Sequence, residues 1–87
     1  MMYTQEWNRA RWAARRGMLE LDLVLGPFVE TCYPDLDEGD RRRFQDLMHC
    51  EDQQLYAWLL RREEPAEEVR AIVGRIVEFA AAGAPGR

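Results

Sequence analysis

The stretch from Arg15 to Asp22, Arg-Arg-Gly-Met-Leu-Glu-Leu-Asp, carries the residues best suited to chemistry. An arginine offers a planar fork of donors for carboxylates and carbonyls, and Gly17 allows a positive φ or a close backbone approach. One interpretation is a corner between two helices, with Glu20 in the first turn of the second, where a carboxylate complements the helix dipole. The other is an exposed recognition patch of Arg16, Gly17 and Glu20. We favour the patch, and the two interpretations are compatible.

Elsewhere the sequence shows no catalytic or metal-binding pattern. His49 adjoins Cys50, but neighbours on a helix point about 100° apart and do not face one another. The two cysteines, Cys32 and Cys50, form no CxxC motif, and no cluster supplies the roughly four ligands of a metal site. The six glycines are scattered, so there is no phosphate-binding or dinucleotide loop. We therefore predict that the protein is not an enzyme, and a small enzyme using Cys32 or Cys50 is the weakest alternative.

Length and charge narrow the remaining classes. The chain has 87 residues, which indicates a single domain over 1–87, and 47% of them are hydrophobic, enough for a core. Residues 1–16 hold four arginines against one glutamate, whereas the rest holds eight against fifteen carboxylates. An acidic body disfavours nucleic-acid binding. No apolar run approaches the roughly 20 residues of a membrane span, and no signal-peptide pattern begins the chain, so we expect a cytoplasmic protein.

Apolar residues recur with helical spacing throughout, and no alternating strand pattern appears. The fold class predicted is all-α, a compact bundle of five short helices. The clearest stripe combines Val69, Ile72, Val73, Ile76 and Val77. We expect a frayed tail over about 83–87. The expected helices cover about residues 4–15, 18–33, 38–50, 53–62 and 65–82.

Several helix boundaries are predicted from local signals. Asp37 and Asp52 are the expected N-caps of the third and fourth helices, and Pro65 fits the first position of the fifth. Pro27 lies inside the second helix and cannot donate to the carbonyl four residues earlier. The second helix should therefore either kink at Gly26-Pro27, which we favour, or end at Leu25.

A small helical domain without catalytic residues usually works by contact. A standard interface takes about 800 Å² from each partner and depends on a few Arg or aromatic anchors. The opening stretch offers Arg15, Arg16, Gly17 and Glu20 for this purpose. Trp12, among arginines, is either a surface cation–π partner or a core residue, and we favour the core.

Two blocks of the sequence resemble the small FAD assembly factors of succinate dehydrogenase. The first is the motif Arg16-Gly17-x-x-Glu20, whose flanking matches are Trp12, Arg15, Leu21-Asp22 and Pro27-Phe28. The second reads Glu51-Asp52-x-x-Leu55-Tyr56-x-Trp58-Leu59, and Phe44 and Leu47 are also similar in type and spacing. The likeness covers about residues 7–78. Gly39 departs from the family pattern, which puts the start of the third helix in doubt.

The resemblance implies a five-helix protein that binds the flavoprotein subunit of succinate dehydrogenase and, in bacteria, also of fumarate reductase. Such factors promote covalent attachment of FAD to a histidine of that subunit. The FAD would belong to the client, so we expect no stably bound cofactor and a monomer when free. An alternative function is an antitoxin-like regulator with no part in flavin attachment. The candidate partner-binding residues are Trp12, Arg15, Arg16, Gly17, Glu20 and Asp22.

Overall fold

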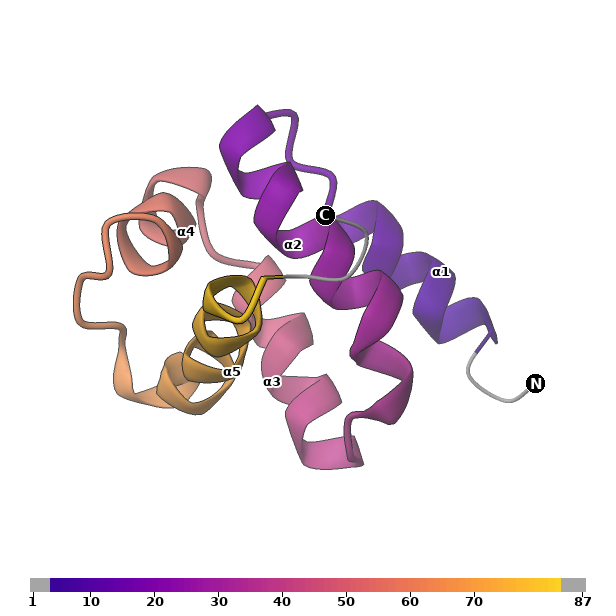
Figure 1. The fold of residues 1–87 in the computed structure, drawn as a ribbon. Helices are drawn as coiled ribbons and strands as arrows, with labels where there is room; N and C mark the ends of the chain where they lie inside the picture. The colour runs from indigo at the N-terminus through magenta and orange to yellow at the C-terminus, as the bar shows by residue number, and fades with distance from the viewer. Residues whose placement is uncertain (1–3, 84–87) are drawn as a thin grey trace.

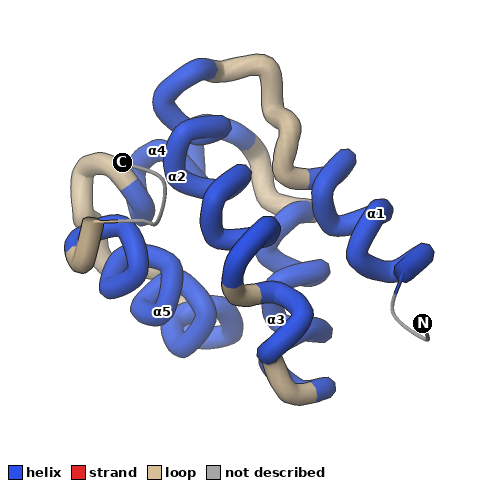
Figure 2. Tube along the Cα trace, turned by 45° about the vertical axis from the view of Figure 1, so that its right-hand side comes forward, coloured by secondary structure: helices blue, strands red, loops and turns tan. Residues whose placement is uncertain are grey.

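The computed structural model describes residues 4–83, and within them every regular element is helical (Figures 1 and 2). This confirms the predicted all-α fold with five helices. Residues 84–87, most of the predicted frayed tail, lie outside the described range. In chain order the elements are α1 (Thr4–Ala13), α2 (Leu19–Thr31), the 3-10 turn η1 (Tyr33–Asp35), α3 (Glu38–Met48), α4 (Asp52–Leu59), the 3-10 turn η2 (Glu67–Val69) and α5 (Arg70–Ala81).

Helix α2 is the centre of the bundle, because it packs against α1, α4 and α5. In both views α1 runs beside α2, while α4 and α5 lie together on the other side (Figures 1 and 2). Phe28 of α2 is buried, and its ring stacks on Phe44 with centroids 5.9 Å apart and meets Phe79 edge-on at 5.7 Å. The Cα radius of gyration is 11.9 Å, close to the value of about 12 Å for a compact chain of this length.

The second helix does not end at Leu25. Helix α2 continues through Pro27 to Thr31, so the carbonyl of Leu23 has no amide partner at residue 27. Leu23 is on the exposed side of α2, whereas Phe28 and Val29 beyond the proline are buried. Burial of these two side chains explains why the helix persists past Gly26-Pro27.

Two of the predicted helix starts are wrong, and one is confirmed. Asp37 caps α3, since its side chain accepts from the amide of Asp40 at 2.8 Å. The N-cap of α4 is Glu51, not Asp52, and its amide donates to the Gln54 side chain at 3.0 Å. Pro65 does not begin α5, because Ala66 is extended with ψ 150° and the chain first makes the turn η2.

Helix α3 begins at Glu38, directly before Gly39, so the departure from the family pattern does not prevent the helix from forming. Four of the five residues of the predicted apolar stripe are buried, namely Val69, Ile72, Val73 and Ile76, and Val77 is half-buried. Gly83 follows α5 with φ +79°, as expected for a glycine after a helix end. Over the described residues, no helix combines the length and apolar character needed to cross a membrane.

Candidate partner-binding site

The sequence Arg15-Arg16-Gly17 forms the corner between α1 and α2. Helix α1 ends at Ala13, and Gly17 adopts φ +80° before α2 begins at Leu19. A Cβ at Gly17 would meet no atom within 4 Å, so the positive φ and not crowding is what favours glycine here. The predicted helix corner is therefore present.

Arg16 points inward from this corner, toward the connection between α3 and α4. Its Nε donates to Oδ1 of Asp52 at 2.9 Å, and only 16% of its side chain is exposed. The two terminal nitrogens donate to three backbone carbonyls, those of Ala13 at 3.0 Å, Met48 at 2.9 Å and Cys50 at 2.9 Å. We call these four bonds the Arg16 network. The expectation that Arg16 faces outward is not met.

Asp22 also serves the corner. Its Oδ1 accepts a hydrogen bond from the backbone amide of Arg16 at 2.8 Å. The bond therefore links the residue before Gly17 to the first turn of α2. A carboxylate that accepts from a backbone amide makes a charge-assisted bond. Asp22 therefore fixes the backbone of the corner, while the Arg16 side chain fixes its position against α3 and α4.

The other four predicted contact residues are exposed. These are Trp12, Arg15, Gly17 and Glu20. The guanidinium of Arg15 lies 5.2 Å from the centroid of the Trp12 ring, which is a surface cation–π contact. Within residues 4–83, neither Arg15 nor Glu20 forms an ion pair with its side chain.

The preference for Trp12 as a core residue is wrong, because its side chain is 70% exposed. Trp7, on the buried side of α1, is the tryptophan that packs against the core, and its indole N–H donates to the carbonyl of Val29 at 3.0 Å. Trp7 shares a face with the buried residues Ala10 and Ala14, whereas Trp12 falls on the opposite face of the same helix.

Two apolar residues beside the corner escaped the sequence analysis. Leu19 and Leu23, 69% and 65% exposed, are one turn apart on α2. Together with Trp12 they are the large hydrophobic side chains that stand out as exposed in the described chain. Their exposure could have been predicted from the sequence, because neither leucine shares the helix face of the buried residues Leu21, Leu25 and Phe28. We define the corner surface as the exposed residues Trp12, Arg15, Gly17, Leu19, Glu20 and Leu23.

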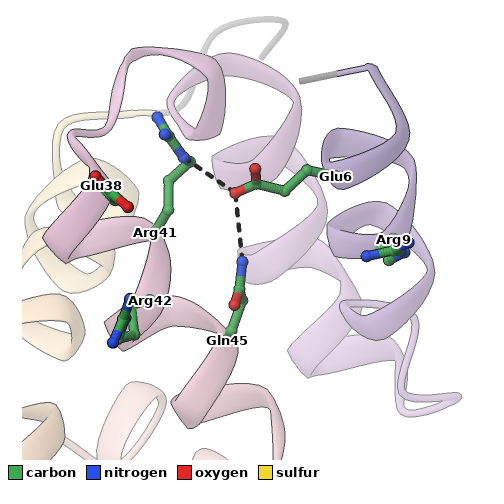
Figure 3. A pocket seen from close by; sticks show the side chains of 6 residues that line it. All are labelled: Glu6, Arg9, Glu38, Arg41, Arg42 and Gln45. Atoms are coloured by element: carbon green, nitrogen blue, oxygen red, sulfur yellow. Dashed lines mark hydrogen bonds and ion pairs between the residues drawn. The ribbon is translucent and has the colours of Figure 1, made fainter. Parts of the chain in front are cut away.

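A hollow of about 430 Å³ between α1 and α2 adjoins the corner surface, and Arg15, Asp22 and Gly26 are among the residues that line it. A second hollow lies between α1 and α3 (Figure 3). There Glu6 extends from α1 toward α3, pairs with Arg41 at 3.0 Å and accepts from Gln45 at 3.3 Å (Figure 3). Glu6, Arg41 and Gln45 therefore form a polar contact between α1 and α3 at this hollow.

The described residues supply little catalytic chemistry. Burial raises the pKa of the Cys32 and Cys50 thiols above its ordinary value, which lowers the fraction of reactive thiolate. Between residues 4 and 83, no three His, Cys, Asp or Glu side chains gather as a metal site would require. What the corner offers is a combination of aromatic, aliphatic and oppositely charged groups, which is suited to binding another protein.

Comparison with known proteins places this corner in a family. The family model described as "Flavinator of succinate dehydrogenase" matches residues 8–80. The chain belongs to this family. A FAD assembly factor SdhE of Pseudomonas aeruginosa is 46% identical over 74 residues, which cover 84% of this chain and 88% of the relative. Its namesake in Pseudomonas putida is 42% identical over 87% of this chain and 96% of its own length. A third FAD assembly factor SdhE, from Vibrio vulnificus, is 48% identical over 69% of this chain and 70% of its own. The flavinator match contains the whole corner surface.

Proposed function

We propose that this chain binds the flavoprotein subunit of succinate dehydrogenase and promotes the covalent attachment of FAD to it. The observation that carries the proposal is membership of the flavinator family over residues 8–80. The corner surface supports it, because it gathers exposed apolar anchors and unpaired charges inside the matched region. The flavoprotein subunit of fumarate reductase is a second client under the same proposal.

The proposed mechanism requires no catalytic residue in this chain. Binding to one domain arrangement of the flavoprotein would raise the population of that arrangement. If the flavin and the accepting histidine are close and well aligned there, the bond forms faster, because the cost of orienting the two groups has already been met. The FAD stays with the client, and the chain acts as a monomeric chaperone without a cofactor of its own.

Each part of the corner surface has a distinct role in this proposal. Arg15 presents a planar guanidinium to a carboxylate of the client, and Glu20 presents a carboxylate to a cation or N–H group. Trp12, Leu19 and Leu23 provide the apolar centre, where burial of aromatic and aliphatic side chains gives most of the affinity. Gly17 lets the client backbone approach the corner closely.

The proposal is tested by the affinity of the purified chain for the flavoprotein subunit. Glu20→Ala should weaken binding by about 2–5 kcal/mol, because the charged partner in the client is left buried and unpaired. Glu68→Ala is the matched control, since Glu68 is also exposed but lies in η2, outside the corner surface. The free energy of unfolding should fall by no more than about 0.3–1 kcal/mol in either variant, because each loses a first-turn carboxylate. Failure of the unmodified chain to bind the subunit would overturn the proposal.

A further inference from the structure

In the Arg16 network, the guanidinium is bonded to groups of its own chain, whereas an arginine that contacts a partner has donors free for it. All three guanidinium nitrogens donate to acceptors within the chain, one carboxylate and three carbonyls. The carbonyls of Met48 and Cys50 belong to the end of α3 and the connection to α4. The carbonyls at a helix end lack intrahelical partners, so Arg16 supplies donors that the backbone cannot.

We propose that Arg16 is a positioning residue for client binding, and that Asp52 is its working partner. In this inference, which rests on the proposed function, Arg16 does not touch the flavoprotein. It holds the α1–α2 corner against the connection between α3 and α4, so that Arg15 and Glu20 are presented with a fixed separation and direction. Asp52 then contributes to binding through Arg16.

The geometry favours this role over direct contact. An arginine that turned outward to a client would leave three part-buried carbonyls without this donor, and buried polar groups are costly to leave unpaired. Asp52, whose side chain is 40% exposed, would also lose its ion pair. Arg16 is also fixed through its backbone, since its amide donates to Asp22. Arg15 and Gly17, its two neighbours in sequence, are exposed. Half-buried Arg16 therefore lies between two exposed residues, where its contacts can set their direction.

The variant Asp52→Ala distinguishes the two roles by the direction of its effect. If Arg16 contacts the client, release from Asp52 leaves the guanidinium free, and affinity for the flavoprotein subunit stays the same or rises. If Arg16 is a positioning residue, the corner loosens and affinity falls, by about tenfold for the loss of one hydrogen bond to a charged group. Gln53→Ala, the neighbouring exposed residue in the first turn of α4, controls for disturbance of that helix and should bind normally.

A second pair of variants separates positioning from general stability. Arg16→Lys keeps the charge, but a single ammonium cannot reproduce a planar fork with four acceptors. Its affinity should fall, and amide hydrogen exchange over residues 15–22 should accelerate. Adding Gly74→Ala in α5, where a Cβ meets nothing within 4 Å, should restore the global stability but not the affinity. Recovery of affinity with stability would overturn the inference.

The same measurements identify which idea has failed. If the unmodified chain does not bind the flavoprotein subunit, the proposed function fails and the role of Arg16 in binding fails with it. If the chain binds but Asp52→Ala binds equally well or better, only the positioning role is overturned. An affinity loss in Asp52→Ala with unchanged hydrogen exchange at the corner would also overturn it, because Asp52 would then contact the client itself. In the double variant Arg16→Lys/Asp52→Ala, we expect no loss beyond that of Arg16→Lys.

Discussion

The Nε atom of Arg16 lies 2.9 Å from Oδ1 of Asp52, a residue 36 positions later in the chain. This bond joins the two sequence blocks that resemble the FAD assembly factors, since Arg16 belongs to the first and Asp52 to the second. The sequence motif Arg16-Gly17-x-x-Glu20 predicts a contact site for a partner, but its first residue, Arg16, contacts other helical segments of the same chain. Under the inference drawn above, the exposed residues around Arg16 would depend on that contact for their arrangement.

The corner requires a glycine for conformational reasons. Gly17→Ala should destabilise the fold by about 1–2 kcal/mol, because an L-residue is strained at φ +80°. Chemical denaturation of the two proteins measures the difference. Gly74→Ala makes the same change inside a helix with open space around the new methyl group, and it should stabilise by about 1 kcal/mol. Equal stabilities of Gly17→Ala and the unmodified chain would show that the corner is not strained.

Arg62 is a non-glycine residue with a positive φ, so replacing it with glycine should stabilise the fold. It follows α4 with φ +59°, and the next amide, of Glu63, donates to the carbonyl of Ala57 at 2.9 Å. Arg62→Gly should raise the free energy of unfolding by about 0.5–1 kcal/mol, because glycine adopts this conformation without strain. Arg61→Gly, one residue earlier and without a positive φ, should not stabilise. A loss of stability in Arg62→Gly would contradict the prediction.

The two tryptophans of α1 should respond differently to truncation. Trp7→Ala removes core contacts and a hydrogen bond to Val29, so a loss of about 3 kcal/mol is expected. Trp12→Ala changes an exposed side chain and should alter the stability by less than about 0.5 kcal/mol. Under the proposed function Trp12→Ala still weakens client binding. Normal affinity in Trp12→Ala would remove Trp12 from the proposed interface.

The ionisation of Tyr33 should lower the free energy of unfolding at alkaline pH. Burial raises its pKa to about 12, and its hydroxyl donates to Glu6 at 2.8 Å. Because the folded-state pKa lies above the unfolded value of about 10, this contribution is complete below pH 10 and is lost as the pH rises toward 12. Unfolding measured between pH 9 and pH 12 should therefore show a declining stability, and Tyr33→Phe should remove that part of the decline. A parallel decline in both proteins would contradict the assignment.

Hydrophobic spacing predicted the helices well, because a buried stripe such as Val69, Ile72, Val73 and Ile76 is a local property of the sequence. The residues at which helices begin were harder to predict from the sequence. Glu51 and Asp52 are both acidic and adjacent, but Glu51 is the N-cap and pairs with Gln54, whereas the Asp52 side chain pairs with Arg16. Nothing in the spacing of the chain indicates a partner 36 residues away.

The candidate site was predicted in part for the same reason. Gly17 was recognisable because a glycine between two helical stripes indicates a corner. The direction of Arg16 was not, since three of its four acceptors are backbone carbonyls that any sequence would provide and the fourth, Asp52, is distant in the sequence. Leu19 and Leu23 lie outside the apolar stripe of the second helix, and a stripe identifies the buried face without showing which other apolar side chains are exposed. The position of Trp12 opposite Ala10 and Ala14 was the better guide, and it outweighs the general tendency of tryptophan to be buried.

If this chain promotes flavin attachment, the amount of covalent flavin on the succinate dehydrogenase flavoprotein should depend on it. The measurement is in-gel flavin fluorescence in a strain that lacks this chain, complemented with the unmodified chain, Glu20→Ala or Glu68→Ala. We expect strong fluorescence with the unmodified chain and Glu68→Ala, and weak fluorescence with Glu20→Ala or without complementation. Equal fluorescence in the deletion strain with and without the chain, when no second factor is present, would contradict it.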